Sequence, residues 1–491
     1  MNKKVVIIGA GIAGIATAIR LTAKGYKVEV FEANDYPGGK LSAFSLEQYR
    51  FDAGPSLFTM PHYVDELFEL CGENPRTHFN YQKKEIACQY FWEDGTRLTA
   101  FSDTAQYLKE VEKKLGVPPE VLKAYLTKAK KKYDLTAALF LEKSLHRWKT
   151  LFSVKTLKAL RHLTLFQINK SLDQVNTAAL KEPHLIQLYN RFATYNGSSP
   201  YQTPGIMSLI QHLESHYGTF IPEGGMVSIS NSLFDLAQRQ GVKFHFKQKV
   251  ENIIEEKDRV KGVLVKGQKH LADYVVSNMD IYPTYRKLLP QAKAPEKTLR
   301  QERSSSAVIF YWGVKKSFPA LDLHNILFSE DYPGEFEAIF GAKQLFKDPT
   351  IYINITAKNV PSDAPSGHEN WFVMVNTPVG TSIDWEKEIP TLRKHVLTKI
   401  ERVLGEKITP FIAAEEVLNP PLIEQKTQSY LGALYGASSN NQMAAFLRHP
   451  NFSGQFKNLY FCGGSVHPGG GIPLCLLSAK IVSDEFSRLD D

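Results

Sequence analysis

Three glycines near the start of the chain have the spacing of a phosphate-binding turn. Gly9, Gly11 and Gly14 form the pattern G-x-G-x-x-G. The first glycine of this pattern allows a tight turn, the second lets the backbone approach a pyrophosphate, and the third lets a helix pack closely on a strand. Glu32 follows Gly14 by 18 residues, and an acidic side chain so placed can accept hydrogen bonds from ribose hydroxyls. The set predicts a dinucleotide-binding site.

The residues around these glycines have the pattern of a strand, a helix and a second strand. Residues 5–8 (VVII) are apolar and β-branched, which is typical of a strand buried on both faces. Residues 15–21 follow as a helix, whose N-terminal N–H groups can bind phosphate. Residues 27–32 form the second strand, which ends on the acidic residue. A lone G-x-G-x-x-G is weak evidence, but with strand, helix and acid in place it favours dinucleotide binding.

A secretory signal and a membrane span are the alternatives for this stretch. Asn2, Lys3 and Lys4 before an apolar run do resemble a signal peptide. The run of about 15 residues is shorter than the roughly 20 residues that span a bilayer. Neither alternative explains three spaced glycines, so we reject both.

Length and composition indicate an ordinary globular protein of two or three domains. The chain has 491 residues, 43% hydrophobic and 22% charged, which excludes a disordered chain. Cys71, Cys88, Cys462 and Cys475 show neither metal-ligand spacing nor a disulfide framework. We therefore expect a cytoplasmic protein without a metal or a nucleic-acid partner.

The positive charge of the chain is concentrated in one region. Residues 121–170 contain twelve Lys or Arg and two acidic residues, a net of +10, whereas the whole chain is +8. Within residues 139–168, basic and apolar residues alternate as in helices that lie on anionic membranes. The alternative is an ordinary helix with a solvated cationic face. We expect peripheral attachment to the inner face of the cell membrane. The residues of this stretch are Leu141, Leu145, Trp148 and Phe152, with Lys143, Arg147, Lys149, Lys155, Lys158 and Arg161.

The remaining patterns predict an α/β protein with a discontinuous, doubly wound, Rossmann-like domain. Residues 61–217 read as largely helical, with helices at 105–115 and 118–133. Residues 227–278 read as a β-α-β set that belongs with the N-terminal sheet, with a helix at 227–240 and strands at 242–246, 259–265 and 271–278. Strands at 308–312, 351–355 and 371–375 predict an antiparallel sheet under a helix at 392–404. We predict a nucleotide domain of residues 1–70, 221–285 and 425–491, a helical membrane-associating substrate region at 71–220, and a sheet domain at 286–424.

Four glycine-containing segments occur in an order typical of one family. PGGK (37–40) and DAGPSLF (52–58) follow the first motif, PEGGM (222–226) begins the internal section, and HPGGGIP (467–473) lies near the end. Together they resemble the bacterial carotenoid desaturases of the phytoene-desaturase type, over essentially the whole chain. The resemblance implies FAD, a separate domain for an apolar substrate, and work at membranes. The tail GGSVHPGGGIP, with Ser465 where phytoene desaturases have threonine, is more similar to the 1-hydroxycarotenoid 3,4-desaturases.

The resemblance also implies the residues that contact the cofactor. Glu32 would bind the ribose, Lys40 a phosphate, Val250 the adenine, and Asn278 the dinucleotide. Ser56 and Leu57 would lie along the cofactor, and Leu431 is a weaker choice for the flavin side. The full expected set is Gly9, Gly11, Ile12, Ala13, Gly14, Glu32, Gly39, Lys40, Ser56, Leu57, Val250, Asn278, Leu431, Gly463, Gly464, Gly471 and Ile472.

The implied reaction introduces a C3–C4 double bond into a 1-hydroxycarotenoid such as 1'-hydroxy-γ-carotene. Flavin N5 would take a hydride and the neighbouring carbon would lose a proton, in a dry apolar tunnel. No catalytic base is identified; His467 either assists proton removal or holds its loop. A polar group in the tunnel must meet the hydroxyl, since an unpaired polar group there is costly. Alternatives are a phytoene desaturase, a FAD-dependent carotenoid isomerase, and a prenyl-lipid binder without cofactor. The electron acceptor, oxygen or a quinone, stays open.

Overall fold

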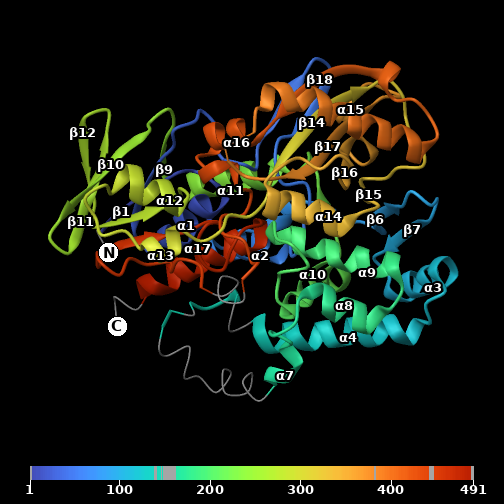
Figure 1. Ribbon diagram of the computed structural model, residues 1–491. Helices are drawn as coiled ribbons and strands as arrows, with labels where there is room; N and C mark the ends of the chain where they lie inside the picture. Colours follow the sequence, from blue (N-terminus) through green and yellow to red (C-terminus); the bar gives the residue numbers. More distant parts are fainter. Residues whose placement is uncertain are drawn as a thin grey trace.

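A five-stranded parallel sheet carries the N-terminal glycine loop (Figure 1). The computed structural model describes residues 3–137, 141–144, 146–147, 162–380, 383–441 and 447–487. The strand order is β19-β13-β1-β2-β9, and every neighbouring pair is parallel. The strands come from three distant parts of the chain. The domain boundaries given above remain predictions. The strands are β1 (Lys4–Ile8), β2 (Lys27–Phe31), β9 (Lys243–His245), β13 (Tyr274–Ser277) and β19 (Leu459–Phe461).

Both faces of this sheet are covered, which explains its continuous apolar strands. Side chains alternate along a strand, so Val5 and Ile7 face one side and Val6 and Ile8 the other. The first side packs on helices and the second on a three-stranded antiparallel sheet. The helices are α1 (Ile12–Ala23), α2 (His62–Leu70), α11 (Val227–Arg239) and α17 (Ile472–Ser487), and the small sheet is β10 (Val250–Glu256), β11 (Arg259–Val265) and β12 (Gln268–Leu271).

Two expectations for this region need correction. Residues 259–265 form a strand as predicted, but the strand lies in the small sheet and not in the N-terminal one. The stretch 271–278 divides into β12 and β13, because Ala272 and Asp273 turn the chain from one sheet into the other. Local periodicity detects a strand but not the sheet that it joins.

A seven-stranded sheet forms the second layer of the molecule, with α15 (Trp385–Leu404) packed on one face. Its order is β18-β14-β17-β16-β15-β6-β7, and the predicted strands and helix are confirmed. The sheet is not wholly antiparallel, since β15 and β6 run parallel. The strands are β6 (Ile86–Phe91), β7 (Arg97–Phe101), β14 (Ser306–Val314), β15 (His324–Leu327), β16 (Ile351–Ile355), β17 (Glu369–Thr377) and β18 (Ile412–Leu418).

The predicted largely helical region, residues 61–217, is helical only in part. It contributes β6 and β7 to the edge of the large sheet, because their apolar residues can be buried there against Ile326 and Phe328. The helices predicted at 105–115 and 118–133 are confirmed as α3 (Thr104–Leu115) and α4 (Pro119–Thr136). Further helices here are α7 (Leu163–Phe166), α8 (Leu172–Leu180), α9 (Pro183–Asn190) and α10 (Ile210–Tyr217).

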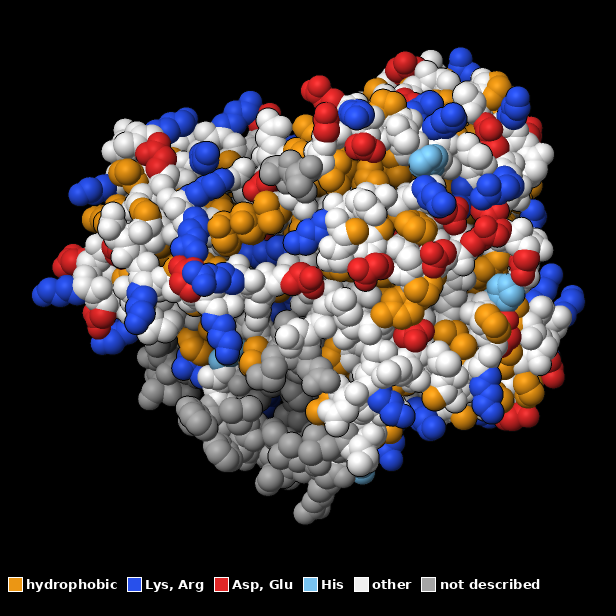
Figure 2. Space-filling model, in the orientation of Figure 1, with side chains coloured by type: hydrophobic (Ala, Val, Ile, Leu, Met, Phe, Trp, Pro, Cys, Tyr) orange, Lys and Arg blue, Asp and Glu red, His pale blue; other side chains and the backbone are white. Residues whose placement is uncertain are grey.

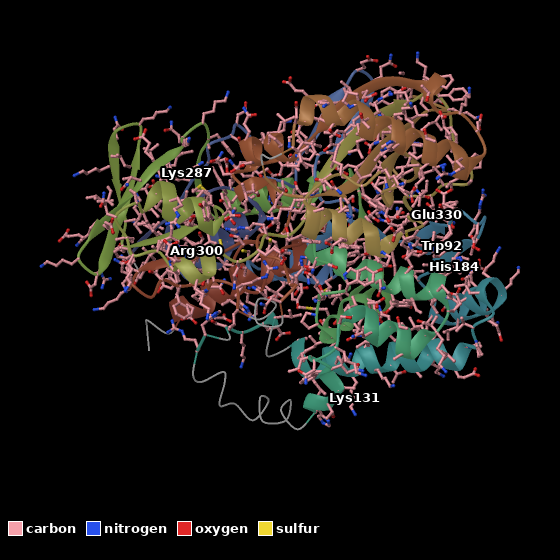
Figure 3. The ribbon with its side chains drawn as sticks, in the orientation of Figure 1. Trp92, Lys131, His184, Lys287, Arg300 and Glu330 are labelled. Atoms are coloured by element: carbon pink, nitrogen blue, oxygen red, sulfur yellow. The ribbon has the colours of Figure 1, made fainter. Side chains whose placement is uncertain are left out.

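The predicted membrane-associating stretch is described only in part. Within the described part of the chain, no helix is both long and apolar enough to cross a membrane. Lys131, labelled in Figure 3, is an exposed residue of α4. Seven residues of the stretch lie outside the described residues: Leu145, Trp148, Lys149, Phe152, Lys155, Lys158 and Arg161.

Short elements complete the architecture and connect the two main sheets. Among them β4 carries the chain into the glycine-containing loop at residues 53–57. They are β3 (Ala43–Leu46), β4 (Tyr49–Asp52), β5 (Tyr81–Lys83), β8 (Phe220–Pro222), α12 (Ile281–Pro283), α13 (Glu296–Leu299), α14 (Tyr332–Phe336) and α16 (Pro420–Thr427).

Candidate functional site

The glycine loop joins β1 to α1 at the carboxyl edge of the parallel sheet. Gly9 donates its N–H to the carbonyl of Phe31 at 2.8 Å, which ties the turn to β2. Gly11 caps α1 without a side-chain hydrogen bond, so the first N–H groups of the helix are available to an anion. A Cβ at Gly14 would lie 2.2 Å from the carbonyl oxygen of Gly9. Only glycine therefore lets helix and loop come this close.

Glu32 lies directly after β2 and holds the loop from the other side. Its Oε2 accepts the N–H of Ala10 at 2.7 Å and its Oε1 accepts the N–H of Asn34 at 2.9 Å. The residue is 7% exposed and lines the large cavity described below. Each carboxylate oxygen can accept a second hydrogen bond, so the side chain can bind two ribose hydroxyls while it holds the loop.

Asn278 closes the crevice where the strand order of the sheet reverses. Its N–H donates to Ile8 O at 2.9 Å, and its side-chain Nδ2 lies 3.3 Å from Gly9 O. In open α/β sheets ligands bind at such a reversal, beyond the carboxyl ends of the strands. The structure therefore brings Asn278 to the same crevice as Gly11 and Glu32.

One cavity of about 1200 Å³ runs from this crevice to the large sheet. It brings together fifteen of the residues predicted for the site, whose individual roles stay predictions. Gly14 lies behind the wall, against Gly9. Leu431 is not part of the wall, although Ser429 and Leu434 near it are. The fifteen are Gly9, Gly11, Ile12, Ala13, Glu32, Gly39, Lys40, Ser56, Leu57, Val250, Asn278, Gly463, Gly464, Gly471 and Ile472.

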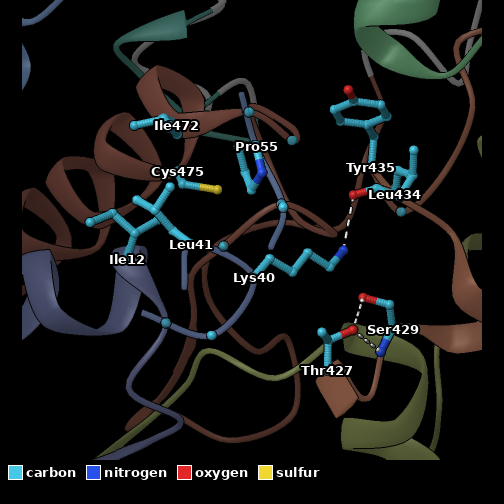
Figure 4. A pocket seen from close by; sticks show the side chains of 18 of the residues that line it. Ile12, Lys40, Leu41, Pro55, Thr427, Ser429, Leu434, Tyr435, Ile472 and Cys475 are labelled. Carbon is cyan, nitrogen blue, oxygen red and sulfur yellow. Dashed lines mark hydrogen bonds between the residues drawn. The ribbon is translucent and has the colours of Figure 1, made fainter. Parts of the chain in front are cut away.

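Lys40 is a buried cation in the wall of this cavity (Figure 4). Its Nζ donates to the carbonyl of Leu434 at 3.0 Å and lies 3.4 Å from that of Ala433. Burial lowers the pKa of the ammonium, an effect that the nearby Asp280 opposes. Two carbonyls leave one donor of the ammonium for a phosphate oxygen, so phosphate binding by Lys40 stays a prediction.

The C-terminal glycine loop, residues 467–473, forms a further part of the cavity wall. His467 lines the cavity, and its Nε2 lies 2.9 Å from the carbonyl of Lys143. A carbonyl only accepts, so this nitrogen donates. Burial lowers the pKa of His467 to about 4, so the ring is neutral at pH 7. These contacts support the loop-holding role of His467 that the sequence left open.

One face of the seven-stranded sheet forms the roof of the far part of the cavity. Because side chains alternate along strands, one set packs on α15 and the other faces the cavity. The register pairs Tyr311 with Phe372, and Ile309 with Met374. Most of this face is apolar, as an apolar substrate requires. Its cavity-lining members are His324, Ile326, Tyr352, Ile309, Tyr311, Phe372, Met374, Asn376, Glu416 and Leu418.

A buried polar cluster lies at the same end and was missed by the sequence reading. Arg191 Nη2 donates to Tyr90 Oη at 2.7 Å and lies 3.7 Å from Glu214 Oε2, and the hydroxyl of Tyr195 donates to the same carboxylate. Tyr332 and Glu335 of α14 also line the cavity, and burial raises the pKa of Glu335 to about 7. These residues are scattered over the sequence, so no motif marks them.

The family follows from comparison with known sequences. The profile of the family described as flavin containing amine oxidoreductase matches residues 12–486. The chain belongs to this family. The chain is 57% identical to a 1-hydroxycarotenoid 3,4-desaturase of a Flavobacterium species, over 98% of either chain. It is 34% identical to a 4,4'-diapolycopene oxygenase of a Methylomonas species, over 99% of this chain and 98% of the relative.

Solved structures of oxidoreductases have the same fold. A cyclohexylamine oxidase from Brevibacterium oxydans superposes with a TM-score of 0.62 over 100% of both chains, at 15% identity. An oxidoreductase from Methanosarcina mazei gives 0.63 over 99% of this chain and 100% of its own, at 16% identity. At such low identity these structures show the fold alone, a mixed α/β fold of the FAD amine-oxidase type.

The cofactor of this family member is FAD, and the residues of the crevice fit it. The chain is a FAD-dependent oxidoreductase. The close approach of loop and helix at Gly14 has no room for a Cβ. The uncapped start of α1 suits a pyrophosphate, and the carboxylate of Glu32 suits a ribose.

Proposed function

We propose that this chain is a FAD-dependent desaturase that introduces the C3–C4 double bond of a 1-hydroxycarotenoid, such as 1'-hydroxy-γ-carotene. The observation that carries the proposal is the 57% identity over 98% of both chains to a 1-hydroxycarotenoid 3,4-desaturase. The cavity agrees with it in character, because an apolar wall with a few polar groups suits a polyene with one hydroxyl.

The protein positions the substrate and excludes water from the reacting carbons. Bound FAD supplies a hydride acceptor. The apolar face of the large sheet, with Ile309, Phe372 and Met374, holds the polyene along the cavity and keeps water from the reacting carbons. The loop of His467 closes the opposite side as a neutral wall. C4 adjoins the polyene and loses the hydride, and C3 lies one carbon further out and loses the proton. The two broken C–H bonds are replaced by the second bond between C3 and C4.

Turnover of two substrates tests this proposal. The enzyme is incubated separately with phytoene and with a 1-hydroxycarotenoid, and absorbance and product mass are followed. We expect the loss of two hydrogens and a red shift of the absorbance with the hydroxylated substrate alone, because only that substrate carries the 1-hydroxyl that the enzyme is proposed to recognise. Efficient turnover of phytoene would instead assign a phytoene desaturase, and an unchanged mass with altered absorbance would assign an isomerase.

We also propose that the enzyme docks peripherally on an anionic membrane. The support is the net of +10 in residues 121–170 and a proposed substrate that dissolves in lipid. On the face shown in Figure 2, Lys and Arg side chains of the described residues are spread among acidic ones and do not form one patch. The basic excess of residues 121–170 is therefore the specific feature to test.

Vesicle sedimentation measures this docking. Reversal of Lys149, Lys155 and Lys158 to glutamate should weaken binding to anionic vesicles and its dependence on salt, since each basic residue near such a surface contributes about 1 kcal/mol. The matched control reverses three exposed lysines of the small sheet, Lys257, Lys266 and Lys269, and should bind like the wild type. Equal binding to neutral and anionic vesicles at any salt would point to apolar docking instead.

A further inference from the structure

A chain of hydrogen bonds links the predicted flavin side of the cavity to the large sheet. The Oγ of Ser56 lies 2.8 Å from the hydroxyl of Tyr352, and that hydroxyl lies 2.8 Å from Nδ1 of His324. All three residues line the cavity. Tyr352 and His324 are on the neighbouring strands β16 and β15, and the register places them on one face of the sheet. These two hydrogen bonds therefore hold the His324 ring close to the loop of Ser56.

The neighbours of His324 determine where its proton is. Asn354 Nδ2 donates to Leu323 O at 3.0 Å, which sets the orientation of the amide, and the same nitrogen lies 3.2 Å from His324 Nδ1. An amide nitrogen only donates, so Nδ1 must accept. Burial lowers the pKa of His324 to about 3, so the ring is neutral at pH 7. The proton is on Nε2.

This Nε2–H group has no partner in the protein. Nε2 of His324 is buried and makes no hydrogen bond to any of the described residues, and the residue is 3% exposed. Buried polar groups in folded proteins are almost always hydrogen-bonded. A donor left unpaired at the wall of a substrate cavity is ready for an acceptor on the substrate.

The substrate of the proposed function has such an acceptor at a matching place. Its hydroxyl is on C1, two carbons from C3, so the hydroxyl must bind close to the bond that faces the flavin. Ser56, predicted to lie along the cofactor, is joined to His324 through one tyrosine hydroxyl. Burial lowers the pKa of the His324 ring, and Arg191, in the buried polar cluster, is close enough for its positive charge to lower that pKa further. This end of the cavity is therefore suited to a terminal polar group.

We propose that Nε2 of His324 donates a hydrogen bond to the 1-hydroxyl oxygen of the carotenoid and that His324 thereby selects hydroxylated substrates. The inference rests on the proposed function for the identity of the substrate. Tyr332 is the rival, because its hydroxyl is also buried, unpaired among the described residues, and in a residue that lines the same cavity. We favour His324 because no hydrogen bond links Tyr332, among the described residues, to the loop of Ser56.

Two substitutions of His324 separate the effect of hydrogen bonding to the substrate hydroxyl from the effect of side-chain packing. In His324→Asn the amide takes the place of Nδ1 and nothing replaces Nε2, whereas in His324→Gln the amide reaches the place of Nε2. The variant Tyr332→Phe is the matched control, since it removes a different buried donor that lines the cavity and has no partner among the described residues. FAD content and thermal unfolding of each variant are compared with those of the wild type, so that a folding defect is recognised.

The readout is equilibrium binding, which does not depend on turnover. The holoenzyme is kept reduced with dithionite, so that it accepts no hydride, and is titrated with a 1-hydroxycarotenoid and with its deoxy analogue. We expect the wild type, His324→Gln and Tyr332→Phe to prefer the hydroxylated polyene, and His324→Asn to lose about tenfold to a hundredfold of that preference. The kcat/KM ratio of the two substrates in the oxidised enzyme should follow the same order.

Other outcomes overturn the inference. No preference in the wild type, or an undiminished preference in His324→Asn, would remove His324 from hydroxyl recognition. Loss of the preference in Tyr332→Phe alone would place the hydroxyl at α14. If the wild type fails to remove two hydrogens but its preference still depends on His324, the proposed reaction fails and the hydroxyl site stands.

Discussion

Replacement of Gly14 by alanine should yield protein without FAD. The new Cβ would lie 2.2 Å from the carbonyl oxygen of Gly9 and 2.9 Å from Nδ2 of Asn278. Both groups are restrained, because a backbone hydrogen bond ties Gly9 to Phe31 and the side-chain Nδ2 of Asn278 donates to Gly9 O at 3.3 Å. The helix must then shift away from the loop that is predicted to bind the pyrophosphate. We expect a cost of about 3 kcal/mol or more, at the upper end for overpacking, and FAD affinity lower by a hundredfold or more.

Flavin absorbance of the purified variant and titration of the apoprotein with FAD measure this loss. Gly454→Ala is the matched control, because a Cβ at Gly454 meets nothing within 4 Å and should leave FAD affinity unchanged. Gly14→Ala protein that is as yellow as the wild type would show that the crevice accommodates the methyl group, and would contradict the close approach seen here.

Loss of the Glu32 carboxylate should also weaken the binding of FAD strongly. Glu32→Ala removes the acceptor predicted for the ribose and leaves the buried N–H groups of Ala10 and Asn34 without their partner. A hydrogen bond to a charged group contributes about 1.5–3 kcal/mol, so the dissociation constant should rise by roughly tenfold to a hundredfold. The loop would at the same time lose its hydrogen bond to Glu32 and keep the bond from Gly9 to Phe31 at the end of β2.

Two further variants show which contacts matter. Glu32→Gln keeps one acceptor oxygen and should bind FAD with intermediate affinity. Glu29→Ala removes a neighbouring carboxylate, that of Glu29 in β2, which pairs with Lys4 at 3.0 Å, and should bind FAD normally because Glu29 does not line the cavity. Unchanged affinity in Glu32→Ala would exclude Glu32 from the FAD site.

The nucleotide crevice was predictable because its parts are close together in the chain. Gly9, Gly11 and Gly14 belong to one strand–turn–helix unit, and Glu32 directly follows the next strand. Backbone geometry over so few residues leaves little freedom, so spacing alone places the glycines in the turn between β1 and α1, where a pyrophosphate is predicted to bind. The periodic helices α3 and α4 and the apolar strands β14, β16 and β17 were predictable for the same local reason.

The substrate end of the cavity depended on contacts between distant parts of the chain. β6 pairs with β15 across more than two hundred residues, and no local pattern shows that pairing. His324, Tyr352 and Ser56 meet only after three separate segments have taken their places. Strand alternation shows that a strand has two faces but not which face the cavity will meet, because that depends on where the sheet packs its other side. Tertiary packing against α15 made that choice, and it placed His324 in the wall of the cavity.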